Sequence, residues 1–590
     1  MFRSRVLLLP LWLAIAMCSA VPFLVALHTY PLPTFYSEFA TGVCWAVLAI
    51  LILALTWRSK VGLPVVALAP LALIGVLFVQ LAVAPPLNPF YSLAATAFLF
   101  AAAVVCGLGA RCRTLPGVLE ALAIGLTLGG VATVAIELLQ LFRVENLPLA
   151  FFSIVPTGTD RRMWGNMNQP NQVASYLAFG LAACAFLAYR CRQVRIPLAF
   201  IALTFLLGMS LAFSRTAWLH IVVVGGLTGL AFTVGELRWR RWLRASIPVL
   251  VLIVVYQLCN WLVMYANIRW HLDLPTSLGE RMHEGVGPRA VLWRHAWHMF
   301  LAHPWLGGGW GDYAWNQYLQ TDILGRAVAA TNAHNIVLDQ LAKVGLFGFL
   351  ALALPILGFA WGIRKRRLTA ELAFLLAIIL VMGGHSMLEF PLHYLFFLLP
   401  LAFVLGYVDE GSLRAPSSSM AWALTALITA GAAVLMTHLW SDYRAVERLH
   451  YAPDGPEREW IRYQQYGPTL LLPYEHLAIA LNLRISPDMA ESLVKMELQA
   501  AQFYPGGGTV QRYALGLAYQ GKTDEAVTQI RRLHYEYWDR ADYAPQIQLL
   551  TQICAQEHGV LQAFCARLKS EKLLGDAKAE VEAKSAQSSN

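Results

Sequence analysis

A histidine near an apolar segment is the first residue in this sequence with the properties of a catalyst. His334 lies in the stretch TNAHNIVLDQLAKVGLFG (residues 331–348), where polar positions lead directly into a long apolar run. An unperturbed imidazole has a pKa near roughly 6.5, which suits proton abstraction at neutral pH. We therefore predict that His334 is a general base, although a histidine at the start of a helix can also have a structural role.

Two arginines add a second kind of chemistry. Arg215 lies in SRTAW (residues 214–218), between two apolar runs and with no other basic residue near it. An arginine at membrane depth costs about 2.5–3.5 kcal/mol on insertion scales and usually marks a functional site, although in a short turn its side chain can simply extend to water. Together with Arg289, which follows Gly287 and Pro288, it offers two planar guanidinium groups, a geometry suited to phosphate oxygens.

The elements that must position these residues are apolar helices. The chain has 590 residues, of which 58% are hydrophobic and only 13% charged, and its mean hydropathy is +0.54. Apolar segments of about 20 residues recur, the length that crosses a bilayer, and the alternation typical of a membrane barrel is absent. We predict an all-α polytopic membrane protein with about 13 transmembrane helices, near 5–27, 39–56, 62–83, 91–110, 116–141, 170–189, 196–213, 216–234, 246–264, 335–360, 369–387, 391–408 and 419–437. The first of these is interpreted as an uncleaved anchor, because it is long and further spans follow it.

Basic residues predict the orientation of this bundle. With the N-terminus inside, eighteen lysines and arginines fall in the inner loops, and four arginines (Arg143, Arg161, Arg162 and Arg215) fall in the short outer loops. This bias follows the positive-inside rule and places the segment after 437 outside. The net charge of +9 is largely explained by the inner loops, so it does not indicate binding to nucleic acid.

Three regions follow from the change in composition. Residues 1–437 are predicted to form the transmembrane bundle, including a large periplasmic loop at 265–334; residues 438–575 a periplasmic α-helical domain; and residues 576–590 a disordered tail. RYALGLAYQGKTDEAVTQIRRL (residues 512–533) resembles one tetratricopeptide unit, which predicts a TPR-like domain, with a generic bundle of helical hairpins as the alternative. Cys554 and Cys565 could form a disulfide in an oxidising compartment or remain unpaired and buried.

Metal and nucleotide chemistry are poorly supported. His295, His298 and His303 are close in sequence, but no H-E-x-x-H motif or carboxylate joins them, and an amphipathic helix with Trp293, Trp297 and Trp305 is the simpler interpretation. The first outer loop lacks a D-x-D pair, no Walker A motif occurs, and the glycines at 307–311 are interpreted as a bend in a loop. We expect no metal and no cofactor.

The unusual polar stretches all fall on the predicted outer side. They are DRRMWGNMNQPNQVASYL (160–177), SRTAW, GPRAVLWRHAWHMFLAHPWLGGGWGDY (287–313), the stretch around His334, and HSMLEFPLHY (385–394). In combination they resemble the O-antigen ligase/polymerase (Wzy_C) superfamily, and WGNMNQPNQVASYL with MLEFPLHYLFFLLPLA resembles the PglL-type bacterial protein O-oligosaccharyltransferases. The resemblance extends from about residue 150 to about 550 and is weak in the first five spans.

The resemblance implies roles for individual residues. Arg215 and Arg289 match arginines that hold a pyrophosphate, and His334 matches an essential histidine. Gln169 and Tyr394 match positions implicated in handling the glycan donor. Substrate-binding candidates in the same stretches are Asn171, Asn335, His385 and Glu389. Many relatives have a glutamate where this chain has Lys343, so a role of that glutamate does not transfer directly. Asp339, four residues earlier, can pair with Lys343 and is the candidate replacement for the glutamate.

The function implied by the resemblance is transfer of a preassembled oligosaccharide. The donor would be undecaprenyl pyrophosphate, the acceptor a Ser or Thr hydroxyl of a periplasmic protein such as pilin, and the reaction a metal-independent inverting displacement in the bacterial inner membrane. The alternatives are an O-antigen ligase that acts on lipid A-core and a Wzy-type polymerase. A transporter or scaffold is disfavoured, because the polar residues concentrate on one side rather than around the membrane midplane.

Overall fold

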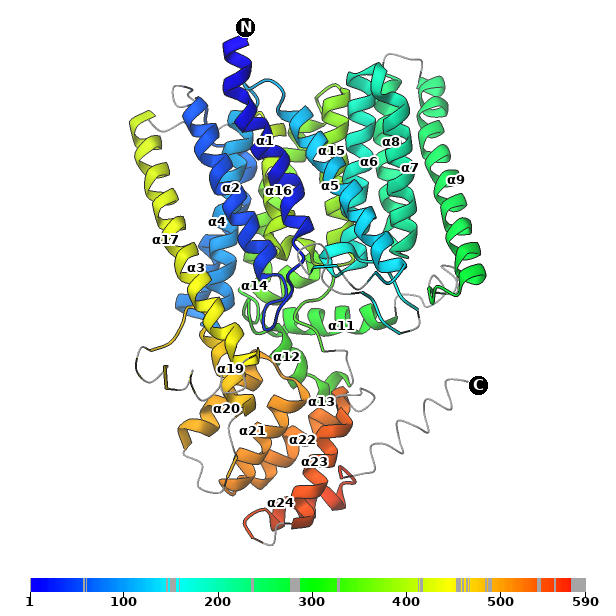
Figure 1. The fold of residues 1–590 in the computed structure, drawn as a ribbon. Coiled ribbons are helices and arrows are strands. Elements are labelled where there is room, and N and C mark those ends of the chain that lie inside the picture. The colour runs from blue at the N-terminus through cyan, green and yellow to red at the C-terminus, as the bar shows by residue number, and fades with distance from the viewer. Residues whose placement is uncertain are drawn as a thin grey trace. The chain divides into compact units, whose positions relative to one another are not determined.

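The computed structural model describes residues 2–574, except for the following: 57–58, 60, 145–146, 149–154, 159, 235–237, 276–286, 326–328, 412, 414–417, 452–457, 459–460, 463–464, 466, 483–484, 487–490, 538–542 and 557–558. The predicted disordered tail at 576–590 lies outside the described residues. Regular structure in the described part of the chain is helical, in agreement with the predicted all-α class (Figure 1).

Eight helices of the described residues are long and apolar enough to cross a membrane. They are α2 (Phe35–Thr56), α3 (Leu68–Val83, with the preceding turn η1, Val65–Ala67), α4 (Pro89–Cys112), α5 (Val118–Leu141), α6 (Pro170–Arg190), α7 (Arg195–Leu211, with η3, Arg192–Val194), α9 (Arg238–Trp270) and α14 (Ile336–Ile363). Shorter apolar helical segments are Leu8–Leu24, which belongs to α1 (Phe2–Leu24), and the helices α8 (Thr216–Phe232), α15 (Ala370–Ser386) and α16 (Leu395–Val408). The chain is a multi-pass membrane protein, and the count of 13 spans stays a prediction.

The chain divides into two compact units. Unit 1 comprises Met1–Ile74, Ala97–Gly285 and Leu350–Met436; unit 2 comprises Gly75–Thr96, Val286–Phe349 and Thr437–Asn590. The predicted boundary at 437/438 falls inside one continuous helix, α17 (Ser418–Tyr451), so the change from apolar to amphipathic sequence is not accompanied by a break in the helix. The predicted domain boundaries themselves stay a prediction.

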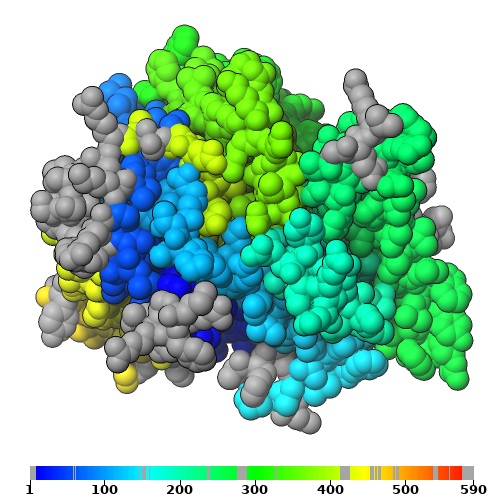
Figure 2. All heavy atoms as spheres, turned by 90° about the horizontal axis from the view of Figure 1, so that it is seen from above, coloured from blue at the N-terminus to red at the C-terminus, as the bar shows by residue number. Residues whose placement is uncertain are grey.

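Unit 1 is organised around α6. This helix packs against α5, α7, α8 and α15, and Figure 1 shows α5 to α8 running side by side. Small residues permit the close approach: a Cβ on Gly180 would lie 2.6 Å from the ring of Phe205 in α7. Close backbone packing through small residues is the usual way in which helices associate in a membrane. In the view of Figure 2, atoms of α7 and α8 lie beside the green atoms of α9, in agreement with the packing of these helices.

Unit 2 contains a bundle of short amphipathic helices. They are α19 (Leu472–Asn482), α20 (Glu491–Phe503), α21 (Gly507–Tyr519), α22 (Thr523–Tyr537), α23 (Tyr543–Gln556) and α24 (Gln562–Ser570). The apolar faces of α20 to α24 form one core with Trp315 and Tyr318 of α12 (Tyr313–Leu319), and α19 packs on α20 in a separate small cluster. The helix, glycine turn and helix expected around residues 512–533 are present as α21, Gly521 and α22, and Gly521 has the positive φ of 77° that favours glycine. The assignment to a TPR-like class stays a prediction.

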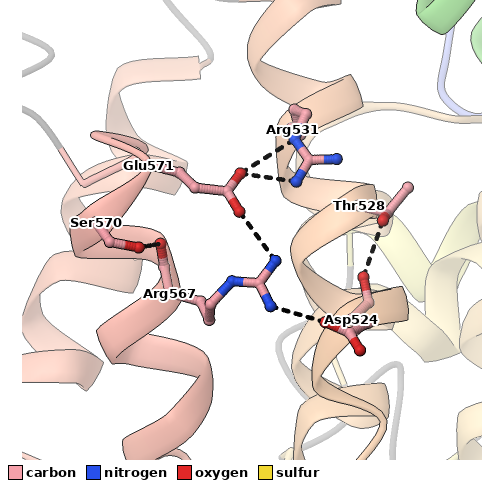
Figure 3. A network of polar contacts seen from close by, with 6 residues as sticks. All are labelled: Asp524, Thr528, Arg531, Arg567, Ser570 and Glu571. Atoms are coloured by element: carbon pink, nitrogen blue, oxygen red, sulfur yellow. Dashed lines mark hydrogen bonds and ion pairs between the residues drawn. The ribbon is translucent and has the colours of Figure 1, made fainter.

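Helices α22, α23 and α24 are tied together by polar and covalent links. Arg531 donates to Glu571, and Arg567 donates to both Glu571 and Asp524, as Figure 3 shows. These ion pairs are partly exposed, so each contributes little to stability. Cys554 and Cys565 are bonded to each other, which decides between the two alternatives left open by the sequence.

The disulfide leads to a count of thiols that can be measured. The described residues include seven free cysteines, and the chain has nine in total. Protein denatured without reductant should therefore add seven maleimide-polyethylene glycol labels, and nine after reduction. A Cys565→Ser variant should add eight labels in both conditions. Nine labels on the unreduced wild-type protein would show that the bond is absent in the cell.

Candidate active site

The predicted donor-site residue Gln169 begins helix α6. Its side-chain Oε1 accepts a hydrogen bond from the Gln172 backbone N–H at 2.7 Å, and Pro170 occupies the first position of the helix. Proline is favoured there because a backbone N–H at this position has no partner within the helix, so its loss costs no hydrogen bond. The sequence QPNQ thus begins α6 at a defined position and fixes Asn171 in the first turn.

Asn171 is the centre of a polar cluster in unit 1. Its amide nitrogen donates to Glu389 Oε1 at 3.1 Å, and its Oδ1 accepts from Ser214 Oγ at 2.7 Å and from Arg162 at 3.5 Å. The structure therefore brings the predicted residues Asn171 and Glu389 together. Ser214 directly precedes Arg215, which is exposed at the start of α8, so this cluster also fixes the backbone beside Arg215.

A second part of the cluster lies deeper among α6, α8 and α15. The Ser175 hydroxyl lies 2.8 Å from Nδ1 of the predicted residue His385 and 3.0 Å from Nε2 of His220, and it donates to the Asn171 carbonyl at 3.2 Å. Ser175, His220 and His385 are completely buried. This polar chain therefore continues from Asn171 into the core of unit 1.

Tyr394 is the last residue of the polar sequence HSMLEFPLHY in unit 1, which begins with His385. It directly precedes α16 and follows the short turn η4 (Pro391–His393). Its ring stacks on Phe396, with 5.3 Å between ring centroids, and lies 5.8 Å from the ring of Phe390. The aromatic neighbours hold the tyrosine in one orientation at the start of the helix.

Four residues of this cluster were not predicted from the sequence: Arg162, Ser175, Ser214 and His220. One sequence signal was available, because Ser175 is four residues after Asn171 and therefore lies on the same face of α6. Arg162, Ser214 and His220 reach the cluster only through the packing of separate elements. Their positions along the chain do not indicate that they lie close to Asn171 or Ser175.

The contribution of the polar cluster to stability can be tested by replacing Asn171. Replacement by alanine removes a shared partner of Arg162, Ser214 and Glu389, and an unsatisfied buried polar group costs about 1–3 kcal/mol. The apparent melting temperature of the purified protein in detergent should fall. The exposed amide Gln193 provides the control, and Gln193→Ala should leave the melting temperature unchanged. Equal melting temperatures for the two variants would contradict the central role of Asn171.

Unit 2 carries the other predicted site residues. Arg289 lies in the first turn of α11 (Gly287–Ala302) and is half-buried. Asn335 caps α14, since its Oδ1 accepts from the backbone N–H groups of Val337 and Leu338 at 3.1 Å each. His334, just before this cap, is partly buried and has a left-handed φ of 50°.

A small apolar core connects the elements that carry Arg289 and His334. Ala296 and Met299 of α11 pack with Ala333, next to His334, and with Ala342 of α14. Because α11 packs on the turn that contains His334, Arg289 and His334 are carried by elements of one packed cluster. Arg215 belongs to unit 1, so the predicted convergence of all three side chains stays a prediction.

The histidine-rich stretch before the glycines is helical, as expected, but the expected amphipathic pattern is wrong: the polar and apolar residues of α11 do not divide between two faces, and His303 and Trp305 lie beyond its end. In α11, His295 is completely buried and Trp297 is 47% exposed. Burial, together with the nearby Arg294 and His298, lowers the pKa of His295 to about 4. His295 is therefore neutral at pH 7 and adds no positive charge to α11.

Helix α14 is interrupted after its second turn, where the glycine-rich loop meets it. Gly345 has φ 64° and ψ −163°, and a Cβ there would lie 2.4 Å from the Trp305 carbonyl carbon. The backbone N–H groups of Gly308 and Gly309 donate to the carbonyls of Ala342 and Lys343 at 2.8 and 3.2 Å. The glycines therefore form the predicted bend, and the bend fixes the first two turns of α14 against it.

Asp339 and Lys343 form the ion pair expected from their spacing. The Lys343 Nζ lies 3.0 Å from Asp339 Oδ2, and both side chains are buried. Both residues lie on the segment of α14 between Asn335 and the break at Gly345.

Three family models match the chain. The O-antigen ligase model matches residues 200–353, the protein glycosylation ligase model residues 163–188, and the C-terminal model of virulence factor membrane-bound polymerases residues 373–549. The resemblance seen in the sequence is confirmed: the chain is similar to the O-antigen ligases and to the PglL-type O-oligosaccharyltransferases. The first two matches include Gln169, Asn171, Arg215, Arg289, His334 and Asn335.

Two relatives extend this result. The chain is 24% identical over 297 residues to a general O-oligosaccharyltransferase of Acinetobacter baylyi, covering 48% of this chain and 50% of the relative. It is 22% identical over 272 residues to a ComP-specific O-oligosaccharyltransferase of the same organism, covering 45% and 47%. The chain thus matches about half the length of each relative. Both relatives are named as enzymes of the glycosyltransferase class.

Proposed function

We propose that this chain is a glycosyltransferase that moves a preassembled oligosaccharide from undecaprenyl pyrophosphate to Ser or Thr hydroxyls of periplasmic proteins. The similarity to two O-oligosaccharyltransferases carries this proposal. The match of the O-antigen ligase model to residues 200–353, which include both candidate arginines and His334, supports it.

The chemistry requires a base and a stabilised leaving group. The acceptor oxygen attacks the anomeric carbon of the sugar, and the bond from this carbon to the pyrophosphate oxygen breaks in the same step. His334 takes the hydroxyl proton, and the bonding electron pair leaves with the pyrophosphate, where Arg215 and Arg289 stabilise the growing negative charge. A single displacement inverts the configuration at the sugar, and the activated pyrophosphate makes ATP unnecessary.

The proposed location is the bacterial inner membrane, with the site and the C-terminal helices on the periplasmic side. The distribution of basic residues favours this orientation. The Cys554–Cys565 disulfide supports it independently, because disulfides persist in oxidising compartments. In this arrangement the apolar spans would hold the polyprenyl tail within the bilayer, and the C-terminal helices would select the acceptor protein.

A lipid acceptor is the second candidate. Its support is the O-antigen ligase model, which covers the residues around both arginines and the histidine. Purified protein should be incubated with an undecaprenyl-pyrophosphate glycan, a chelator, and either a pilin-type protein or lipid A-core. Labelling of the protein acceptor alone is expected. Labelling of lipid A-core alone would replace the proposal by the ligase, elongation of the donor glycan would indicate a polymerase, and dependence on divalent metal would overturn the proposed mechanism.

A further inference from the structure

A buried ion pair lies in the first turns of α14, which follows the candidate base His334 in the chain. Asp339 and Lys343 are each only 4% exposed, and their charged atoms are 3.0 Å apart. Removing two charges from water is expensive, and their mutual attraction offsets this cost only where further partners satisfy both groups. The further partners of this pair therefore indicate what it does.

The carboxylate of Asp339 also binds the turn that carries His334. Its Oδ1 accepts a hydrogen bond at 3.0 Å from the backbone N–H of Ala333, which is completely buried. A hydrogen bond to an ionised acceptor is about twice as strong as a neutral one. The residue directly before His334 is thus held by a charged group on α14.

The turn itself requires such support. His334 has φ 50°, a left-handed conformation that is unfavourable for a residue other than glycine. Strained conformations of this kind persist where the surrounding structure holds them in place. Asn332 Oδ1 accepts from the His334 N–H at 3.4 Å, and the Asp339–Ala333 bond fixes the preceding peptide.

Lys343 is held in place by both its side chain and its backbone. Its Nζ lies 5.7 Å from the ring centroid of Trp310 and 5.6 Å from that of Tyr313, within the range of cation–π attraction. Its carbonyl accepts from the Gly309 N–H, and a Cβ on Gly307 would lie 2.3 Å from its carbonyl carbon. Lys343 therefore neutralises Asp339 from a position that the glycine loop determines.

We infer that Asp339 is a positioning residue, whose carboxylate holds the His334 turn in its catalytic conformation while Lys343 balances its charge. This inference rests on the proposed role of His334 as the base. The oxygen that accepts from Ala333 and the negative charge of the carboxylate are separate features of Asp339. The two functions of the pair can therefore be separated by substitution.

Two double variants separate the acceptor oxygen of Asp339 from its charge. Asp339→Asn with Lys343→Met removes both charges but keeps a side-chain oxygen that can accept from Ala333. Asp339→Leu with Lys343→Met also removes both charges, and leucine has nearly the shape of asparagine without an acceptor. Replacing both partners of a buried pair by uncharged groups is commonly tolerated, so both variants should insert and fold.

Hydrogen–deuterium exchange and kinetics provide the two measurements. In the asparagine variant, the weaker but retained hydrogen bond should keep exchange of a peptide containing Ala333 much closer to the wild-type rate than in the leucine variant, and most of the wild-type kcat should remain. In the leucine variant, exchange should be faster and kcat should fall roughly 10- to 100-fold, because a misplacement of about 1 Å can cost about 100-fold in rate. KM for the donor should be unchanged in both.

Equal exchange and equal kcat in the two double variants would overturn the inference. The exchange measurement does not depend on activity, so it tests the hydrogen bond even in a chain that transfers no glycan. Absence of transfer by the wild-type protein would instead contradict the proposed function. The two failures are therefore distinguishable.

Discussion

Replacing His334 by alanine should reduce kcat for glycan transfer by about 100- to 10,000-fold, the usual contribution of a positioned general base. Without the imidazole, the acceptor hydroxyl has no group to take its proton as it attacks the sugar. The measurement is a transfer assay with purified protein at saturating donor. Expression and membrane insertion should be unchanged, because His334 is only partly buried.

Two further variants separate chemistry from conformation at this position. Asparagine tolerates the left-handed φ of 50° that His334 adopts, so His334→Asn should keep the turn and still lose activity. His303, an exposed histidine of the same unit, is the matched control, and His303→Ala should remain active. Near-normal kcat for His334→Asn would remove His334 as the base.

Replacing Arg215 by alanine should reduce kcat by about 100- to 1,000-fold, by analogy with the loss of one donor that stabilises a developing negative charge. Arg215→Lys should recover only part of this loss. Lysine keeps the charge, but it lacks the planar fork that binds two phosphate oxygens at once. The measurement is kcat and KM for the undecaprenyl-pyrophosphate glycan.

The control for Arg215 is another arginine of the predicted outer loops. Arg143 is half exposed and pairs with Asp273 at 2.6 Å, and Arg143→Lys should have little effect on kcat. If Arg215→Lys also retains normal kcat and KM, the side chain of Arg215 simply extends to water and has no part in binding the leaving group.

The existence of the helices could be predicted because their apolar length is a local property of the sequence. Their ends were less predictable. The predicted span 246–264 is part of α9, which extends from Arg238 to Trp270, since charged and aromatic residues can continue a helix beyond the apolar core of a membrane. Helix α17 likewise continues through the predicted boundary at 437/438.

In the candidate site, too, contacts within one helix could be predicted from the sequence, and contacts between segments distant in the chain could not. The Asp339–Lys343 pair follows directly from a spacing of four residues on one helix. The break at Gly345 could not be predicted in the same way, because it depends on backbone bonds to a loop about 40 residues earlier in the chain. The Asn171 cluster also requires three separate elements to pack together.

The convergence of His334 with the arginines is the central claim, and cross-linking tests it most directly. The seven free cysteines would be replaced, the pair Arg215→Cys and His334→Cys introduced, and a short bifunctional thiol reagent added to intact membranes. Asn171→Cys with Glu389→Cys, whose native side chains are hydrogen-bonded at 3.1 Å, is the positive control. We expect both pairs to cross-link. A cross-link in the control pair alone would show that the imidazole and this guanidinium occupy separate sites, and would contradict the proposed mechanism.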